Sequence, residues 1–89
     1  MKKDVKRRVL RRLKIIEGQV RALQRMVEEE TYCVDVITQA SAARQALSSV
    51  EDAMLENHLS THVVEQVRNG DHKQVSKEIL SIYKVAKRK

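Results

Sequence analysis

The sequence predicts an all-α protein made of three helices, and three observations support this. The 89 residues include no proline and only two glycines, so the residue types that most often interrupt helices are nearly absent. Apolar residues recur every three or four positions, which is the spacing of one helical face. The only clear turn signal is Asn69-Gly70-Asp71, because glycine readily takes the left-handed conformation that ends helices.

The first helix is expected at about residues 4–29. An apolar row runs along it with steps of three and four, formed by Val5, Val9, Leu13, Ile16, Val20, Leu23 and Val27. Such a row is one side of an amphipathic helix. The acidic run at residues 28–30 leaves this pattern, so the helix is expected to end there.

The second helix is expected at about residues 32–68 and the third at about 72–86. At 1.5 Å per residue the second would be about 55 Å long. Its apolar residues are Val36, Ala40, Ala43, Leu47, Val50 and Met54, continued by Leu55, Leu59, Val63 and Val67. The third helix has Val75, Ile79, Ile82 and Ala86 and is too short to cover that surface. We therefore expect a single domain, residues 1–89, that forms a helical bundle with copies of itself.

Positive charge is concentrated at the N-terminal end. Residues 1–14 hold eight Lys or Arg and one Asp, a balance of +7, and the remaining residues balance at −1. On the first helix a basic stripe of Arg7, Arg11, Lys14, Arg21 and Arg25 is flanked by Arg8 and Arg12. Such a segment favours a polyanion, either nucleic acid or an anionic membrane surface. No helix-turn-helix or zinc-finger signature accompanies it.

The remaining composition indicates where the protein works. The single cysteine excludes an intrachain disulfide, which fits a reducing compartment. No apolar run is long enough to span a membrane, and the basic N-terminus lacks the apolar segment of a secretion signal. We therefore expect a cytoplasmic protein.

His58 and His62 are candidate metal ligands, because histidines four apart on a helix can share one ion. Leu59 occupies the position that holds the general base in the H-E-x-x-H motif of zinc proteases, so we do not expect an enzyme. Cys33 would lie about 37 Å from His58 along one helix, and only an antiparallel partner helix could bring it close. A thiolate with two imidazoles suits Cu(I) or Zn(II). The alternative is that Cys33 is a small buried residue and the histidines are solvated.

The segment RLKIIEGQVRALQRMVEEETYCVDVITQASAARQAL, residues 12–47, resembles the CsoR/RcnR/FrmR family of small bacterial sensor-repressors. The resemblance implies a disc-shaped dimer of dimers, each dimer an antiparallel four-helix bundle. It implies binding of operator double-stranded DNA in the apo state and release by an inducer, with no small-molecule substrate. By the same resemblance, Cys33 of one subunit and His58 and His62 of its neighbour would bind the metal. Tyr32 and Glu78 would link that site to the third helix.

His62 departs from the usual copper pattern, which has a second cysteine there. The nickel and cobalt sensors add an N-terminal histidine, the formaldehyde sensors a proline at position two, and the persulfide sensors a second cysteine; this chain has none of these. Elimination favours Cu(I), with a zinc or cadmium sensor as an alternative and a nickel or cobalt sensor as another. For DNA we expect contacts from Arg7, Arg8, Arg11, Arg12, Lys14, Arg21 and Arg44. A structural helical oligomer with a basic surface is the further alternative.

Overall fold

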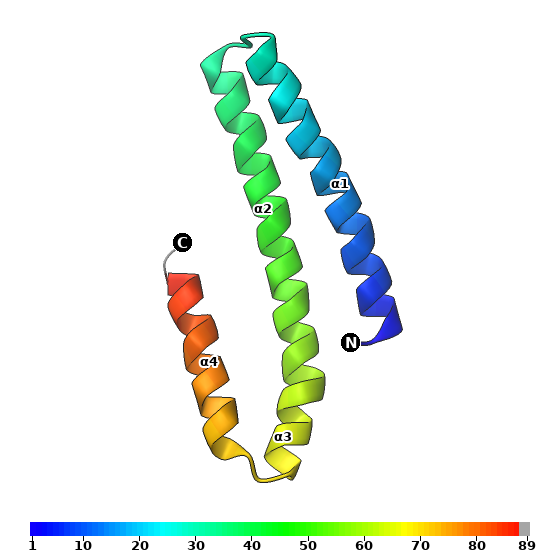
Figure 1. Ribbon diagram of the computed structural model, residues 1–89, viewed down its shortest axis with the longest axis vertical. Helices are drawn as coiled ribbons and strands as arrows, with labels where there is room; N and C mark the ends of the chain where they lie inside the picture. Colours follow the sequence, from blue (N-terminus) through cyan, green and yellow to red (C-terminus); the bar gives the residue numbers. More distant parts are fainter. Residues whose placement is uncertain (88–89) are drawn as a thin grey trace. The chain divides into compact units, whose positions relative to one another are not determined.

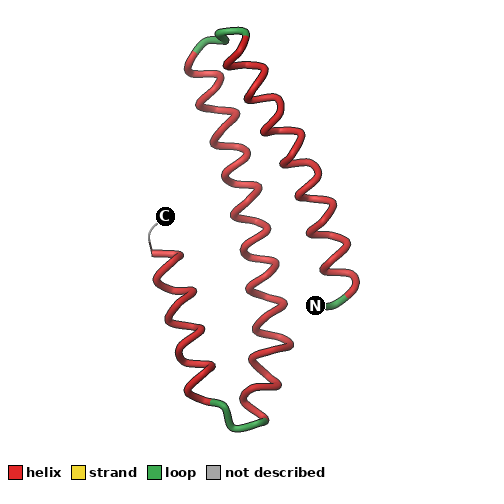
Figure 2. Tube along the Cα trace, in the orientation of Figure 1, coloured by secondary structure: helices red, strands yellow, loops and turns green. Residues whose placement is uncertain are grey.

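The computed structural model describes residues 1–87, which are helical with short turns and contain no strand (Figures 1 and 2). The elements are α1 (Lys3–Glu28), α2 (Cys33–His58), the π-helix η1 (Leu59–Val63), α3 (Val64–Arg68) and α4 (His72–Lys87). The all-α prediction is confirmed. The segment predicted as one long α-helix is helical throughout 33–68, but a π-helical turn interrupts its α-helical geometry. The chain divides into two compact units, Met1–Glu56 and Asn57–Lys89.

The first unit is an antiparallel pair of helices, α1 and most of α2. Val5 and Val9, early in α1, form a buried cluster with Ala53, late in α2, and Val50 packs against it. Arg12, one turn further along α1, is hydrogen-bonded to Ser49. Later residues of α1 thus contact earlier residues of α2, so the two helices run antiparallel, as Figure 1 shows.

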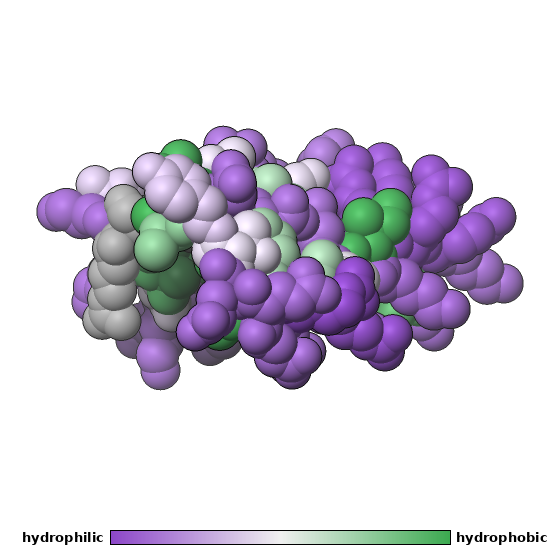
Figure 3. Space-filling view, turned by 90° about the horizontal axis from the view of Figure 1, so that it is seen from above, coloured by the Kyte–Doolittle hydropathy of each residue, from purple (hydrophilic) through white to green (hydrophobic). Residues whose placement is uncertain are grey.

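Only part of the predicted apolar row of α1 is buried. Val5, Val9 and Ile16 are buried. By contrast, Leu13, Val20 and Val27, which recur every seven residues, are 39%, 44% and 63% exposed. On α2, Ile37, Leu47 and Met54 are also exposed, and Figure 3 shows apolar side chains open to solvent among hydrophilic ones. Exposed apolar side chains that recur along helices in this way are typical of surfaces that bind another chain.

Two turns end helices in the same way. In each turn, one backbone hydrogen bond reaches back five residues and another reaches back three. After α1 these bonds run from Thr31 N to Met26 O and from Glu30 N to Val27 O. After α3 they run from Asp71 N to Gln66 O and from Gly70 N to Val67 O. This is the Schellman pattern, whose central residue is left-handed. Gly70 has φ 76°, as predicted from the sequence, whereas the equivalent residue after α1 is Glu30, with φ 55°.

The second unit begins at Asn57 and contains η1, α3 and α4. The turn at 69–71 reverses the chain, so that α4 packs against α3. Two of the three candidate ligands and Glu78 lie in this unit. No helix within residues 1–87 is long and apolar enough to cross a membrane.

Candidate metal centre and nucleic-acid surface

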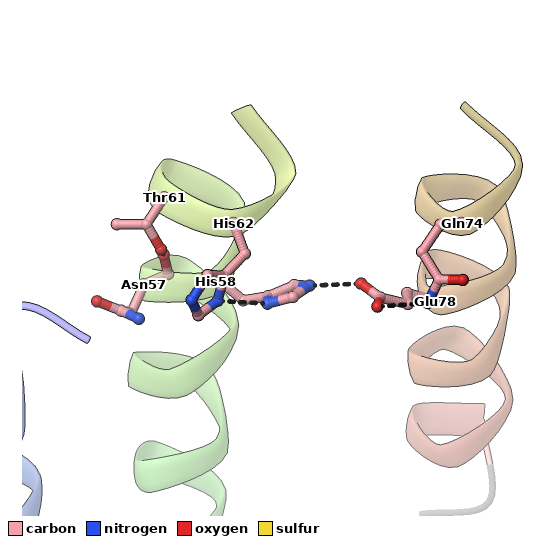
Figure 4. A network of polar contacts seen from close by, with 6 residues as sticks. All are labelled: Asn57, His58, Thr61, His62, Gln74 and Glu78. Atoms are coloured by element: carbon pink, nitrogen blue, oxygen red, sulfur yellow. Dashed lines mark hydrogen bonds and ion pairs between the residues drawn. The ribbon is translucent and has the colours of Figure 1, made fainter. Parts of the chain in front are cut away.

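The histidine pair predicted from the sequence is formed in the second unit. His58 is the last residue of α2 and His62 lies in η1. Their Nδ1 atoms are 3.3 Å apart, and the ring centroids are 5.3 Å apart (Figure 4). One ion that binds two imidazole nitrogens at about 2.0–2.1 Å, at an angle between tetrahedral and trigonal, holds those nitrogens about 3.3–3.6 Å apart. In the metal-free chain this separation is a hydrogen-bond distance between the rings, and it also matches the spacing of two imidazoles on one ion.

Glu78 on α4 fixes the orientation of the His58 ring. Its Oε2 lies 2.9 Å from Nε2 of His58, and the two side chains are 27% and 29% exposed. A carboxylate can only accept a hydrogen bond, so Nε2 of the imidazole carries the proton and donates it. In the neutral ring, Nδ1 then keeps its lone pair and faces His62. Metal-binding histidines are commonly oriented by such a carboxylate on the far nitrogen.

The Glu78 carboxylate is itself held in place. Nε2 of Gln74, one turn earlier on α4, donates to Oε1 at 2.8 Å. This bond, and after it the bond from His58, lowers the pKa of Glu78 below its ordinary value of 4.5. Glu78 therefore remains an acceptor at neutral pH. Gln74 was not predicted from the sequence, although its spacing of four residues from Glu78 on one helix was a usable signal.

The π-helix is a second feature that was not predicted from the sequence. It follows His58 directly and includes His62. The backbone carbonyl of Asn57 accepts hydrogen bonds from Thr61 Oγ1 at 2.6 Å and Ser60 Oγ at 3.2 Å. Hydroxyls that bond back to a carbonyl in this way compete with regular helical hydrogen bonds. Two adjacent hydroxyl residues between two histidines were the only sequence signal.

Cys33 is not part of the histidine pair in the single chain. It is the first residue of α2, in the first unit, and is an exposed free thiol. Tyr32, beside it, is 72% exposed. Within residues 1–87 no three His, Cys, Asp or Glu side chains are grouped so as to hold a metal ion. The described chain thus supplies two imidazoles at one place and a thiol at another.

The residues predicted to bind DNA differ in how accessible they are. Those that are exposed are Arg7, Arg8, Arg11, Lys14, Arg21 and Arg44. Arg21 pairs with Glu17 at 2.7 Å, on a well-solvated part of α1, where such a pair contributes little. Arg12 is half-buried: its Nη1 donates to Ser49 Oγ at 2.8 Å and lies 3.5 Å from Ser49 O. Arg12 therefore joins α1 to α2, a role that residue spacing did not predict.

Comparison with known proteins identifies relatives of this chain. The chain is 42% identical over 79 residues to the copper-sensing transcriptional repressor CsoR of Bacillus subtilis, covering 89% of this chain and 78% of that protein. It is 50% identical over 60 residues to the copper-sensing transcriptional repressor RicR of Mycobacterium tuberculosis, covering 67% of this chain and 62% of that protein. These relatives are transcriptional repressors and not enzymes.

A solved structure has the same fold. It is the crystal structure of the copper-sensing repressor CsoR with Cu(I) from Geobacillus thermodenitrificans, with a TM-score of 0.87 and 38% identity, covering 94% of this chain and 88% of that one. The sequence profile of a family described as metal-sensitive transcriptional repressor matches residues 5–86. Since the profile covers nearly the whole chain, the chain belongs to the family of metal-sensitive transcriptional repressors.

Proposed function

We propose that this protein is a cytoplasmic, Cu(I)-responsive repressor that binds operator double-stranded DNA without metal and releases it when Cu(I) binds. The observation that carries the proposal is the pair of Nδ1 atoms 3.3 Å apart, with the far nitrogen of His58 bonded to Glu78. Two imidazoles arranged in this way would supply two of the three ligands of such a Cu(I) site. The relatives named above as copper-sensing repressors support the choice of ligand and of activity.

Cys33 of one subunit would complete the site formed by His58 and His62 of its neighbour. About seven helical turns separate Cys33 from His58, so both lie on one face of α2. The row between them follows steps of four and three: Cys33, Ile37, Ala40, Arg44, Leu47, Glu51, Met54 and His58. If two α2 helices pair antiparallel with Cys33 beside the partner's His58, Ile37 falls beside the partner's Met54. Both of these apolar residues are exposed in the single chain, so this register buries them.

The donor set favours Cu(I). A soft thiolate with two imidazoles suits Cu(I) in three-coordination, whereas Zn(II) takes four ligands and would need a water or another side chain. Zn(II) is therefore the main competitor, followed by cadmium, nickel and cobalt within the same family.

A site divided between subunits links metal occupancy to assembly. We propose a dimer built as an antiparallel four-helix bundle and a disc-shaped dimer of dimers, in which the exposed rows of α1 and α2 are buried. Tyr32 and Glu78 would transmit occupancy, since Glu78 bonds the metal-facing His58 ring to α4. Thermodynamic linkage then requires that DNA weaken metal binding by the factor by which metal weakens DNA binding.

The DNA surface would be the basic side of α1 with Arg44 of α2. The exposed Arg7, Arg8, Arg11, Lys14 and Arg21 would contact phosphates, and Arg12 would contribute from its position against Ser49. Arg44 belongs to the row of α2 that would pair with the partner, so it would reach a phosphate only by extending its side chain past the edge of that interface. Contacts of this kind give strongly salt-dependent affinity and position the protein without reading bases.

Anaerobic titration tests the function directly. Operator duplexes are first selected from a random library with the apo protein, and their fluorescence anisotropy is then followed as Cu(I) or Zn(II) is added. Release by Cu(I), with Cys33→Ala remaining bound at every Cu(I) concentration, is the expected result. Release by Zn(II) alone would replace copper by zinc and keep the sensor mechanism. DNA binding that no metal alters would favour a structural oligomer with a basic surface.

A further inference from the structure

We propose that Thr61, assisted by Ser60, is a positioning residue that holds η1 in its π-helical form and so sets the geometry of the His58–His62 pair. This inference rests on the proposed metal-binding role of the pair, and it adds a determinant that lies outside the ligand set and outside Tyr32 and Glu78.

The two hydroxyls meet at the junction between the α-helix and the π-helix. α2 ends at His58 and η1 begins at Leu59, so the Asn57 carbonyl belongs to the last α-helical turn. It accepts the 2.6 Å bond from Thr61 Oγ1 and the 3.2 Å bond from Ser60 Oγ. Asn57 is only 4% exposed, so water has little access to that carbonyl. Figure 4 shows Thr61 beside Asn57, on the same two turns as the histidines.

Hydrogen-bond requirements explain why hydroxyls are needed there. In an α-helix each carbonyl accepts from the amide four residues later, and in a π-helix from the amide five residues later. The Thr61 and Ser60 hydroxyls both donate to the Asn57 carbonyl, and hydroxyls that bond back in this way compete with the regular helical hydrogen bond of that carbonyl. The two hydroxyls thereby weaken the α-helical pattern at this point and favour the π turn over continued α-helix.

The π turn changes where His62 points. In an α-helix, residue i+4 is rotated about 40° beyond residue i. A π-helical turn contains more residues, so His62 is rotated less far round the axis relative to His58. The observed Nδ1–Nδ1 separation of 3.3 Å belongs to this wider turn. Loss of the hydroxyls would let the segment return to α-helix and would change the angle between the two rings.

Thr38 provides a matched control in the same protein. Its Oγ1 donates to the Val34 carbonyl at 2.9 Å, also four residues earlier, but within ordinary α-helix. Thr61→Val and Thr38→Val therefore remove the same kind of bond and keep the side-chain shape. Only the first lies beside the histidine pair. Thr61→Ser restores the hydroxyl, and Ser60→Ala removes the longer of the two bonds.

The first measurement uses the apo protein, with NMR contacts between the His58 and His62 rings and amide signals of residues 59–63 as readouts. Thr61→Val is expected to lose the ring–ring contact, and Thr61→Ser and Thr38→Val to retain it. The second measurement is anaerobic Cu(I) competition titration with X-ray absorption of the loaded protein. Groups that orient metal ligands typically alter affinity by about 10–100-fold. We expect a loss in that range for Thr61→Val and a smaller one for Ser60→Ala, with an altered arrangement of the imidazoles at the copper in Thr61→Val.

The outcomes separate this proposal from the proposed function. If Thr61→Val keeps the ring–ring contact and binds Cu(I) as the unaltered protein does, Thr61 does not position the pair. An equal loss of affinity in Thr38→Val would also overturn the proposal, because the effect would then be general destabilisation. If the unaltered protein binds no Cu(I), the copper assignment fails, and the apo ring–ring contact still decides the role of Thr61. Should Thr61→Val fail to fold, Ser60→Ala provides the same two tests.

Discussion

Replacement of Arg12 by methionine should destabilise the protein, because its guanidinium bridges α1 and α2. A hydrogen bond that involves a charged group contributes about 1.5–3 kcal/mol. The Arg12–Ser49 bond is short at 2.8 Å, but it is only partly buried, and the second interaction, at 3.5 Å, is long. We therefore expect about 1 kcal/mol for the pair. Arg12 also lies on the same face of α1 as Val9 and Ile16, both buried, and the methionine keeps most of its aliphatic packing.

A double-mutant cycle measures this interaction. Urea unfolding of the unaltered protein, Arg12→Met, Ser49→Ala and the double variant, at one subunit concentration, gives the coupling free energy between the two side chains. The neighbouring Arg11→Met is the control, because Arg11 is exposed and its replacement should change stability by less than about 0.5 kcal/mol. A coupling free energy below about 0.3 kcal/mol would show that the Arg12–Ser49 bond does not stabilise the protein in solution.

The same variants separate structural from DNA-binding roles. Each phosphate contact that is lost should reduce the slope of log affinity against log salt by about 0.9, and a substitution removes one such contact in every subunit that touches the DNA. Arg11→Met is expected to flatten this slope without loss of stability. Arg12→Met is expected to lose stability, with a smaller change in slope, because its guanidinium is already bonded to Ser49. Equal changes in slope would mean that Arg12 leaves Ser49 to bind DNA.

Three further predictions concern the turns, the Glu78 carboxylate and Tyr32. Glu30 has φ 55°, and a left-handed non-glycine residue costs about 1–2 kcal/mol, part of which is offset by the greater freedom of glycine in the unfolded chain. Glu30→Gly should therefore raise the free energy of unfolding by about 0.5–1 kcal/mol. Gly70→Ala, at φ 76°, should lower the free energy of unfolding by about 1 kcal/mol in the same urea assay. The lowered pKa of Glu78 means that its contribution to stability is complete above the ordinary carboxyl pKa and disappears as pH falls through the folded-state pKa. The stability difference between the unaltered protein and Glu78→Gln should therefore stay constant above the ordinary carboxyl pKa of 4.5 and shrink as the pH falls below it. Tyr32→Phe should bind Cu(I) in the competition titration and yet release DNA poorly; release as complete as in the unaltered protein would remove Tyr32 from the coupling.

Much of the fold was predictable because helix formation follows residue spacing. The apolar period located all three helical segments, and the lone Asn-Gly located the second turn. The left-handed residue of the first turn was not predictable, because Glu30 gives no sequence signal for that conformation. The apolar period also predicted a longer buried row on α1 than the structure has. Leu13 and Val20 fit the same spacing as Val5 and Val9, but the packing against α2 places Arg12 on the buried face and leaves those two residues exposed.

The candidate site was predictable to a lesser degree. Spacing alone brought His58 and His62 together, since four residues on a helix place two side chains on one face. The hydrogen bond between His58 and Glu78 joins residues twenty positions apart, and only the family resemblance indicated it. The π-helix was not predictable, because five residues are too few for a hydrophobic period to distinguish π from α geometry. Cys33 and His58 lie at opposite ends of α2, so in the proposed site Cys33 would come from a second chain.

We expect His58 to make α4 sensitive to a bound metal, because both nitrogens of its ring are engaged. Nδ1 faces His62, while Nε2 is bonded to Glu78, and Gln74 ties that carboxylate to the preceding turn of α4. A ring drawn towards a partner's thiolate must either carry Glu78 with it or break the 2.9 Å bond. In both cases α4 changes its environment. Cu(I) should therefore alter amide hydrogen exchange in residues 72–87. Glu78→Gln should reduce this change in exchange while Cu(I) still binds. An undiminished change in Glu78→Gln would mean that metal binding reaches α4 by another route.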